Sequence, residues 1–69
     1  MIEVFKTNVQ ETEQSKMIVK ELLEHFPNGI INFDLEDCDK ILRVHASSIS
    51  NHTIIALLNS YGYQCEVLP

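Results

Sequence analysis

The chain has 69 residues, of which 45% are hydrophobic and 22% are charged. This composition is typical of a globular domain and not of a disordered tail or a disulfide scaffold. A chain this short buries only about 60% of the surface that its unfolded state exposes, so we expect a single domain, residues 1–69, with one core. Ten acidic residues against five Lys and Arg give a formal charge of −5, which repels phosphate backbones and disfavours nucleic acid as a partner.

The cellular location is predicted from the absence of a membrane span and of a secretion signal, and from the two cysteines. No run approaches the roughly 18 to 20 apolar residues of a membrane span, and the first residues include Glu3 where a secretion signal carries basic residues. Cys38 and Cys65 are far apart and form no CxxC pair, which favours reduced thiols, although a single bridge between them remains an alternative. We therefore expect a cytoplasmic protein with no membrane contact.

The first two predicted elements are a strand and a helix. Ile2 and Val4 alternate with Glu3, which predicts a half-buried strand over residues 1–7. A helix is predicted over residues 12–26, with Thr12 as its N-cap and Asn8 as a rival cap. It ends before a Pro-Asn-Gly stop at residues 27–29, and its apolar positions follow helical spacing: Met17, Ile18, Val19, Leu22, Leu23 and Phe26.

A strand pair, a second helix and a closing strand complete the pattern. Two alternating runs, Ile31–Phe33–Leu35 and Leu42–Val44–Ala46, flank the polar segment 36–39, which predicts an antiparallel hairpin. Ser47, Ser48, Ser50 and Asn51 are cap candidates for a helix over residues 51–61, which ends at Gly62. Residues 63–67 are predicted as the last strand.

This element order predicts an α+β ferredoxin-like βαββαβ sandwich, with two helices packed on one face of a four-stranded antiparallel sheet. The other face is then free to meet solvent or a partner. We expect Phe5, Ile41 and Ile30 to form a contact patch there, suited to self-association or to another protein. Pairing of exposed strand edges between copies is a second possible route.

Read from end to end, the chain resembles the heavy-metal-associated (HMA) domain, a small copper and zinc chaperone module that also occurs in metal-pumping ATPases. The resemblance covers nearly all residues. It depends on the apolar spacing from Val19 to Phe26 before Gly29-Ile30, on the strand from Ile31 to Glu36, and on Ile54, Leu57 and Leu58 leading into Tyr61-Gly62-Tyr63. The resemblance implies the ferredoxin-like fold.

The chain departs from the HMA pattern at the metal site. That family holds soft metal ions with two cysteines in a Met-x-Cys-x-x-Cys stretch between the first strand and the first helix. Here the stretch from Thr7 to Ser15 contains no cysteine. Counting back from the helix puts Thr12 and Ser15 at the two cysteine positions, whereas counting forward from the strand puts them near Val9 and Thr12, and the mismatch implies a longer loop. The resemblance therefore implies the fold without the metal site, and we expect no cofactor.

The predicted topology gathers acidic residues at one end of the sheet, where the first loop, the hairpin and the turn at residues 61–62 should meet. These acids suit a hard cation or a basic partner, although acidic turns are usually only solvated. Cys38 lies among them and should be exposed, which makes it a candidate soft ligand or an incidental thiol. The candidate metal ligands are Cys38, Glu11, Glu13, Asp37 and Asp39, and further acids nearby are Asp34 and Glu36.

The remaining reactive side chains are predicted to be structural. Cys65 alternates with Tyr63 and Val67 and should be an inert core thiol. His25, His45 and His52 do not share the short spacing of a zinc site and should lie on the surface.

Function is predicted by elimination. No Ser-His-Asp set, Cys-His set or glycine-rich phosphate loop is visible, so we do not expect an enzyme. The preferred hypothesis is a non-catalytic HMA-like interaction module that binds a protein partner or itself. The alternative is a copper or zinc carrier with non-standard ligands such as Cys38.

Overall fold

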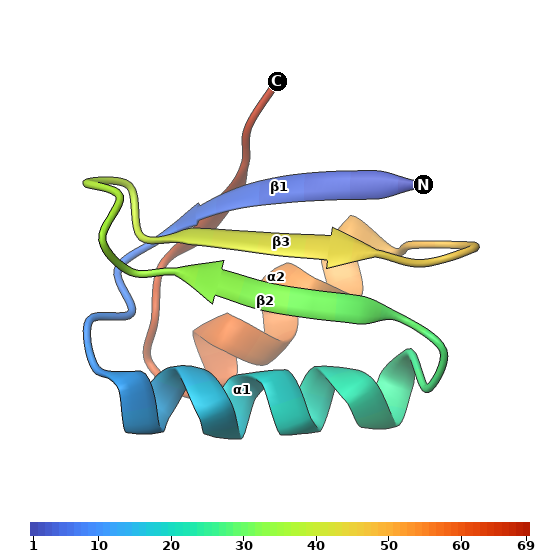
Figure 1. The fold of residues 1–69 in the computed structure, drawn as a ribbon, viewed down its shortest axis with the longest axis horizontal. Coiled ribbons are helices and arrows are strands. Elements are labelled where there is room, and N and C mark those ends of the chain that lie inside the picture. Colours follow the sequence, from blue (N-terminus) through green and yellow to red (C-terminus); the bar gives the residue numbers. More distant parts are fainter.

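The computed structural model describes residues 1–69 as one antiparallel sheet covered by two helices. The elements are β1 (Ile2–Thr7), α1 (Thr12–His25), β2 (Ile30–Asp34), β3 (Ile41–His45), α2 (Asn51–Ser60) and β4 (Cys65–Val67). The strand order is β2-β3-β1-β4, so β2 and β4 are the edge strands. Both helices lie on the same side of the sheet (Figure 1). This arrangement confirms the predicted α+β ferredoxin-like fold.

The core combines the inner face of the two central strands with one face of each helix. The core residues are fully buried, and half-buried Ile31 and Phe33 of the neighbouring strand β2 pack against them. Burying a side chain of this size contributes about 1.5–3 kcal/mol. The eight fully buried hydrophobic residues are Phe5, Val9, Ile18, Leu22, Leu42, Val44, Ile54 and Leu58.

The prediction that Phe5 lies on the open face of the sheet was wrong. Phe5 is 0% exposed and belongs to the core, whereas Ile2 is 60% exposed. The register explains the difference, because Phe5 is paired with Leu42, and residues directly opposite each other in a sheet point to the same face. Ile2 and Val4 therefore lie on the open face. Ile30 lies there as predicted and is 64% exposed.

The predicted caps of the first helix were also wrong. Glu11 is the N-cap of α1, with no hydrogen bond from its side chain, and Thr12 is the first helical residue. The Asn8 side chain is used elsewhere, because its Oδ1 accepts a hydrogen bond from the Gln64 N–H at 2.8 Å. The second helix follows the prediction, since the Ser50 side chain accepts from the Thr53 N–H.

The last strand is shorter than the predicted range 63–67. Gly62 ends α2 with a φ of +89°, a conformation that favours glycine. The Tyr63 N–H then donates to the Leu58 carbonyl at 3.0 Å, so Tyr63 belongs to the helix end and not to the sheet. Ladder pairing with β1 starts only at Cys65, opposite Thr7. Neither helix combines the length and the apolar character that a membrane crossing requires.

The assignment of Phe5 to the core gives a direct stability test. We expect Phe5→Ala to lower the free energy of unfolding by about 3–5 kcal/mol, because it removes a buried aromatic ring and leaves a cavity. The matched change on the open face, Ile2→Ala, should cost no more than about 0.5 kcal/mol. Urea unfolding followed by circular dichroism measures both. Equal losses for the two variants would contradict the observed register.

Candidate functional site

Three connections meet at one end of the sheet, as the sequence predicted. They are the loop after β1, the hairpin between β2 and β3, and the segment that leads into β4. The Thr7 N–H donates to the Asp39 carbonyl at 3.0 Å, which ties the first loop to the hairpin. The bond from Gln64 N–H to Asn8 Oδ1 ties the same loop to the third connection. This end is therefore held together by polar contacts from all three segments.

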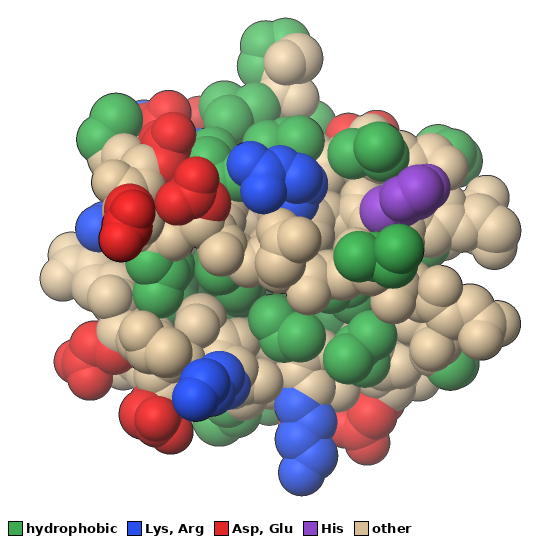
Figure 2. All heavy atoms as spheres, viewed as in Figure 1, with side chains coloured by type: hydrophobic (Ala, Val, Ile, Leu, Met, Phe, Trp, Pro, Cys, Tyr) green, Lys and Arg blue, Asp and Glu red, His purple; other side chains and the backbone are tan.

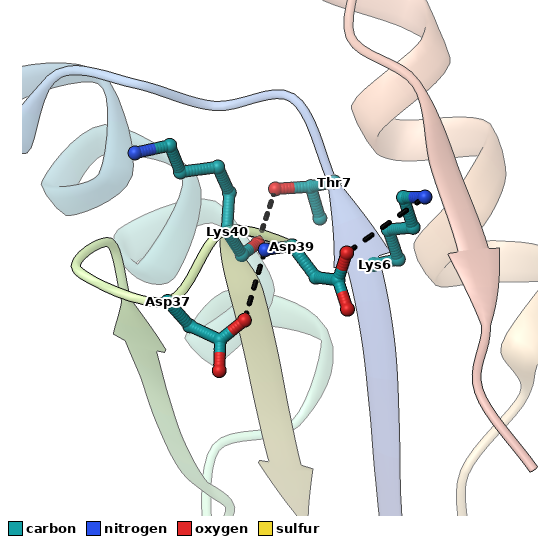
Figure 3. A network of polar contacts seen from close by, with 5 residues as sticks. All are labelled: Lys6, Thr7, Asp37, Asp39 and Lys40. Carbon is teal, nitrogen blue, oxygen red and sulfur yellow. Dashed lines mark hydrogen bonds and ion pairs between the residues drawn. The ribbon is translucent and has the colours of Figure 1, made fainter.

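Thr7 is the central residue of this network (Figure 3). It is 6% exposed, and its hydroxyl donates to the Lys40 carbonyl at 2.6 Å and accepts from the Val9 N–H at 3.2 Å. Lys40 has a φ of +46°, in the left-handed region. Its ammonium group donates to the Leu35 carbonyl at 2.8 Å. These bonds hold the hairpin and the start of the first loop in one conformation.

One group of potential metal ligands occurs at this end: Asp37, Cys38 and Asp39. Their nearest ligand atoms lie within 4.8 Å of one another. Part of the group already has partners, because Asp37 Oδ1 accepts from the Asp39 N–H at 2.9 Å and Asp39 Oδ1 lies 3.8 Å from Lys6 Nζ. Copper(I) favours thiolate or thioether ligands, of which this group has one, and zinc accepts thiolates and carboxylates but usually takes four protein ligands in a structural site, whereas this group supplies three. The group can offer weak coordination at most, at an exposed surface.

The other acidic candidates do not join this group. Glu11 is the N-cap of α1 and Glu13 lies in the first helical turn, and neither belongs to the set around Cys38. Asp34 and Glu36 are also outside it. The sequence therefore located the acidic end correctly, but it overestimated how many carboxylates approach each other there.

In the loop between β1 and α1, where the predicted HMA resemblance would place a cysteine pair, the side chains have structural roles. Val9 is 0% exposed and lies in the core. Ser15 is 7% exposed, and its hydroxyl donates to the Thr12 carbonyl at 2.7 Å. In either register, therefore, one of the two positions is buried. The loop does not present two side chains that face a common ion.

Cys65 is half-buried and packs against the core. Burial raises the pKa of the Cys65 thiol to about 11, and the adjacent Glu66 carboxylate adds to the rise. The thiol is therefore protonated at neutral pH. The Cys65 thiol of the folded protein stays protonated to a higher pH than the thiol of the unfolded chain, whose pKa is near 9. Folding stability from this group is complete below that value and declines as the pH rises toward 11.

The three histidines are exposed, as predicted, and lie on three different elements. His25 is the last residue of α1, His45 is on β3 and His52 is on α2. None of them joins the group of potential metal ligands.

The open face of the sheet carries two exposed isoleucines on either side of a histidine, here called the open-face patch: Ile2, Ile30 and His45. Ile2 and Ile30 flank His45 in one row across three strands. Ile2 and Ile30 are 60% and 64% exposed. Figure 2 shows hydrophobic side chains exposed beside a histidine on this part of the surface. Next to it, the Arg43 side chain donates to Asn32 Oδ1 at 3.2 Å. Ile41 shares this face but is only 7% exposed, so it adds little contact area.

A groove of about 470 Å³ lies between α1 and the edge strand β2, and the sequence analysis missed it. The α1 wall consists of Thr12, Ser15, Lys16 and Val19, and the opposite wall of Ile31, Asn32 and Phe33 from β2 and Leu35 just after it. The signal available from the sequence was indirect. The predicted topology makes β2 an edge strand, and its inward residues then have no strand beside them.

Comparisons with protein-family models, with curated proteins and with solved structures found no match. The resemblance to the HMA domain therefore stays a prediction from the sequence.

The different surroundings of the two thiols lead to a labelling prediction. At pH 8, iodoacetamide should modify the exposed Cys38 and spare Cys65. In Cys38→Ser protein, the labelling rate of Cys65 should keep rising about tenfold per pH unit beyond pH 9, because its pKa is about 11. Mass spectrometry after timed quenching gives the rates. In urea, where burial is lost, the rate should level off near pH 9, and the same plateau in the folded protein would contradict the assigned environment.

Proposed function

We propose that this chain is a non-catalytic protein-interaction module, with an HMA-like fold that lacks the metal-binding cysteine pair. The observation that carries the proposal is the open-face patch. Two helices cover one face of the sheet and leave the other uncovered, and Ile2 and Ile30 are more than half exposed on it. Large apolar side chains exposed close together on one face commonly mark interaction sites.

The surroundings of the patch suit a protein partner. Asn32, Arg43 and His45 border the exposed isoleucines on the same face, and such polar groups orient a partner around an apolar centre. The same arrangement permits self-association through two copies of the patch. Burial of Ile2 and Ile30 against a partner would provide the main favourable free energy of binding.

The arrangement of reactive groups supports a non-catalytic role. General acid–base and nucleophilic mechanisms require the participating groups within hydrogen-bonding reach. Here the histidines lie on separate elements, and the raised pKa of Cys65 makes its thiol a poor nucleophile. Both cysteines are free, which supports a cytoplasmic location, because exposed thiols persist best in a reducing compartment.

The alternative function is a copper or zinc carrier centred on Cys38. It is favoured by one observation, the approach of Asp37 and Asp39 to the Cys38 thiol within 4.8 Å. To bind an ion there, Asp39 would have to leave Lys6, and the exposed group offers only one thiolate. Soft ions favour several thiolate or thioether ligands, so the interaction module is the better supported function.

The open-face patch is tested by affinity capture from the native cell with matched variants. Ile30→Asp places a charge in the apolar contact, so it should abolish capture of a specific partner. If the protein instead self-associates, the same change should weaken self-association at least tenfold. Met17→Asp is the control, because Met17 is 43% exposed on α1. It introduces the same charge on the helical side of the protein, away from the open face. Quantitative mass spectrometry and sedimentation measure the two readouts. Equal behaviour of Ile30→Asp and wild type would contradict the proposal.

Metal titration separates the proposal from the alternative. Reduced wild-type protein should take up copper(I) or zinc only as a weak background, and Cys38→Ser should not change it. A metal carrier would instead bind one equivalent tightly and lose that binding in Cys38→Ser but not in Cys65→Ser. Competition with a chelator of known affinity gives the stoichiometry and strength. Tight one-to-one binding that depends on Cys38 would replace the interaction module with the carrier.

A further inference from the structure

The outer edge of β2 has backbone groups without partners, and their positions follow from the sheet register. Met1 and Ala46 exchange two hydrogen bonds, N–H to carbonyl at 2.8 and 3.0 Å. In an antiparallel ladder, such pairs alternate with pairs whose backbone groups point away from each other. Along β1 and β3 the next bonded pairs are therefore Glu3 with Val44 and Phe5 with Leu42.

The same alternation passes to β2. The backbone groups of Val44 and Leu42 point to β1, so β3 bonds to β2 through the residues between them. Those residues pair with Ile30, Asn32 and Asp34. The N–H and carbonyl groups of Ile31 and Phe33 consequently point outward, and no hydrogen bond within the protein involves them. This edge can pair with another strand.

The groove lies directly beneath these free groups. The side chains of Ile31 and Phe33 form its β2 wall, and Val19 on α1 faces them across it. Figure 2 shows hydrophobic side chains along the boundary between β2 and α1. A strand added to β2 would place every second side chain over this groove, because side chains alternate between the two faces of a sheet. The edge thus combines hydrogen-bonding groups with an apolar space for alternate residues.

Basic side chains surround this edge in a protein that is acidic as a whole. Lys16 lines the groove on the α1 side. Arg43 reaches β2 from the open face and bonds to Asn32, and Lys40 bonds to the Leu35 carbonyl beyond the end of the strand. Three of the five Lys and Arg residues therefore lie around β2. The charges favour an acidic occupant near the middle of the strand, away from Asp34 and Glu36.

We propose that an extended acidic peptide segment of a protein partner binds here as a fifth strand beside β2. Its apolar residues at alternate positions enter the groove beneath Ile31 and Phe33, and its acidic residues lie near Arg43 and Lys16. This inference rests on the proposed interaction function and assigns it a second surface, separate from the open-face patch. Main-chain pairing supplies affinity, and the groove selects apolar side chains.

A second copy of the chain fits this edge less well. Pairing of two β2 edges about a two-fold axis would place the two α1 helices beside each other, with Lys16 and Lys20 of each copy near those of the other. Like charges placed together oppose association, so an acidic segment of another protein is the better occupant.

The test uses a short fluorescent peptide in which valine alternates with glutamate, and fluorescence anisotropy measures its binding to the full chain. We expect saturable binding in the micromolar range. Methylating the backbone nitrogens of one edge of the peptide removes its N–H donors and should weaken binding at least tenfold. A peptide with lysine in place of glutamate should bind at least tenfold more weakly as well.

Protein variants locate the binding on β2. Ile31→Pro removes the outward N–H and leaves the ladder to β3 intact, since proline is tolerated on an edge strand where the N–H faces outward. Ile31→Ala is the matched control, because it shortens the same side chain and keeps the N–H. We expect Ile31→Pro to bind the peptide at least tenfold more weakly than Ile31→Ala. Lys16→Glu should weaken binding about three- to tenfold, and circular dichroism checks that each variant is folded.

Three results would overturn the inference. The first is that the peptide does not bind the wild-type protein. The second is that the methylated peptide binds with unchanged affinity, which would indicate a groove that binds without strand pairing. The third is that the wild-type protein forms a dimer and that Ile31→Pro dissociates it. If Ile31→Pro does not fold, the methylated peptide still decides the question. Ile30→Asp tests the open-face patch separately, so loss of partner capture there with no peptide binding would overturn only the β2 site.

Discussion

The register between β1 and β3 determines the rest of the structure. Phe5 lies opposite Leu42. This pairing directs every second side chain of β1 toward the helices and the side chains between them toward the open face. A shift by one residue would send Phe5 to solvent and bring Lys6 into the core, since side chains alternate strictly along a strand. Burial of Phe5 and Leu42 in the same cluster with Ile18 and Leu22 makes that shift unfavourable.

The same register creates both proposed interaction surfaces. Once Phe5 and Leu42 point to the helices, Ile2 and Ile30 must flank His45 on the uncovered face. The bonding phase that pairs Phe5 with Leu42 also directs the backbone of Ile31 and Phe33 away from β3. A sheet of four strands covered on one side leaves one face and two edges open. Here Ile2 and Ile30 lie exposed on the face, and Ile31 and Phe33 line the groove at the β2 edge.

The sequence predicted the fold well because periodicity and stop signals are local. The helix limits at Pro27 and Gly62 and the hairpin around residues 36–39 depend on neighbouring residues alone, and the structure has all of them. The face of β1 was predicted wrongly because Ile2, Val4 and Phe5 supply apolar residues to both of its faces. Only the pairing with β3, a contact between distant parts of the chain, decides between them. The groove was missed for the same reason, since it lies between α1 and β2.

The acidic end shows the same division between local and distant information. Its location follows from the topology, but the exact neighbours of each carboxylate depend on the hairpin conformation, with Lys40 in the left-handed region and Asp39 beside Lys6. Sequence spacing placed Glu11 and Glu13 near Cys38, whereas the helix start fixes them on α1. A cluster of acids in a sequence therefore indicates a common end of the fold and not a common site.

The loop between β1 and α1 is held by hydrogen bonds to the hairpin and to the segment before β4, and by one buried side chain. Thr7 makes hydrogen bonds to Lys40 and Val9, and Asn8 makes one to Gln64. Each such bond contributes about 0.5–1.5 kcal/mol, and complete burial of Val9 adds about 1.5–3 kcal/mol. Together these contacts fix the loop through ordinary packing and polar pairing. The conformation of this loop therefore follows from contacts within the chain.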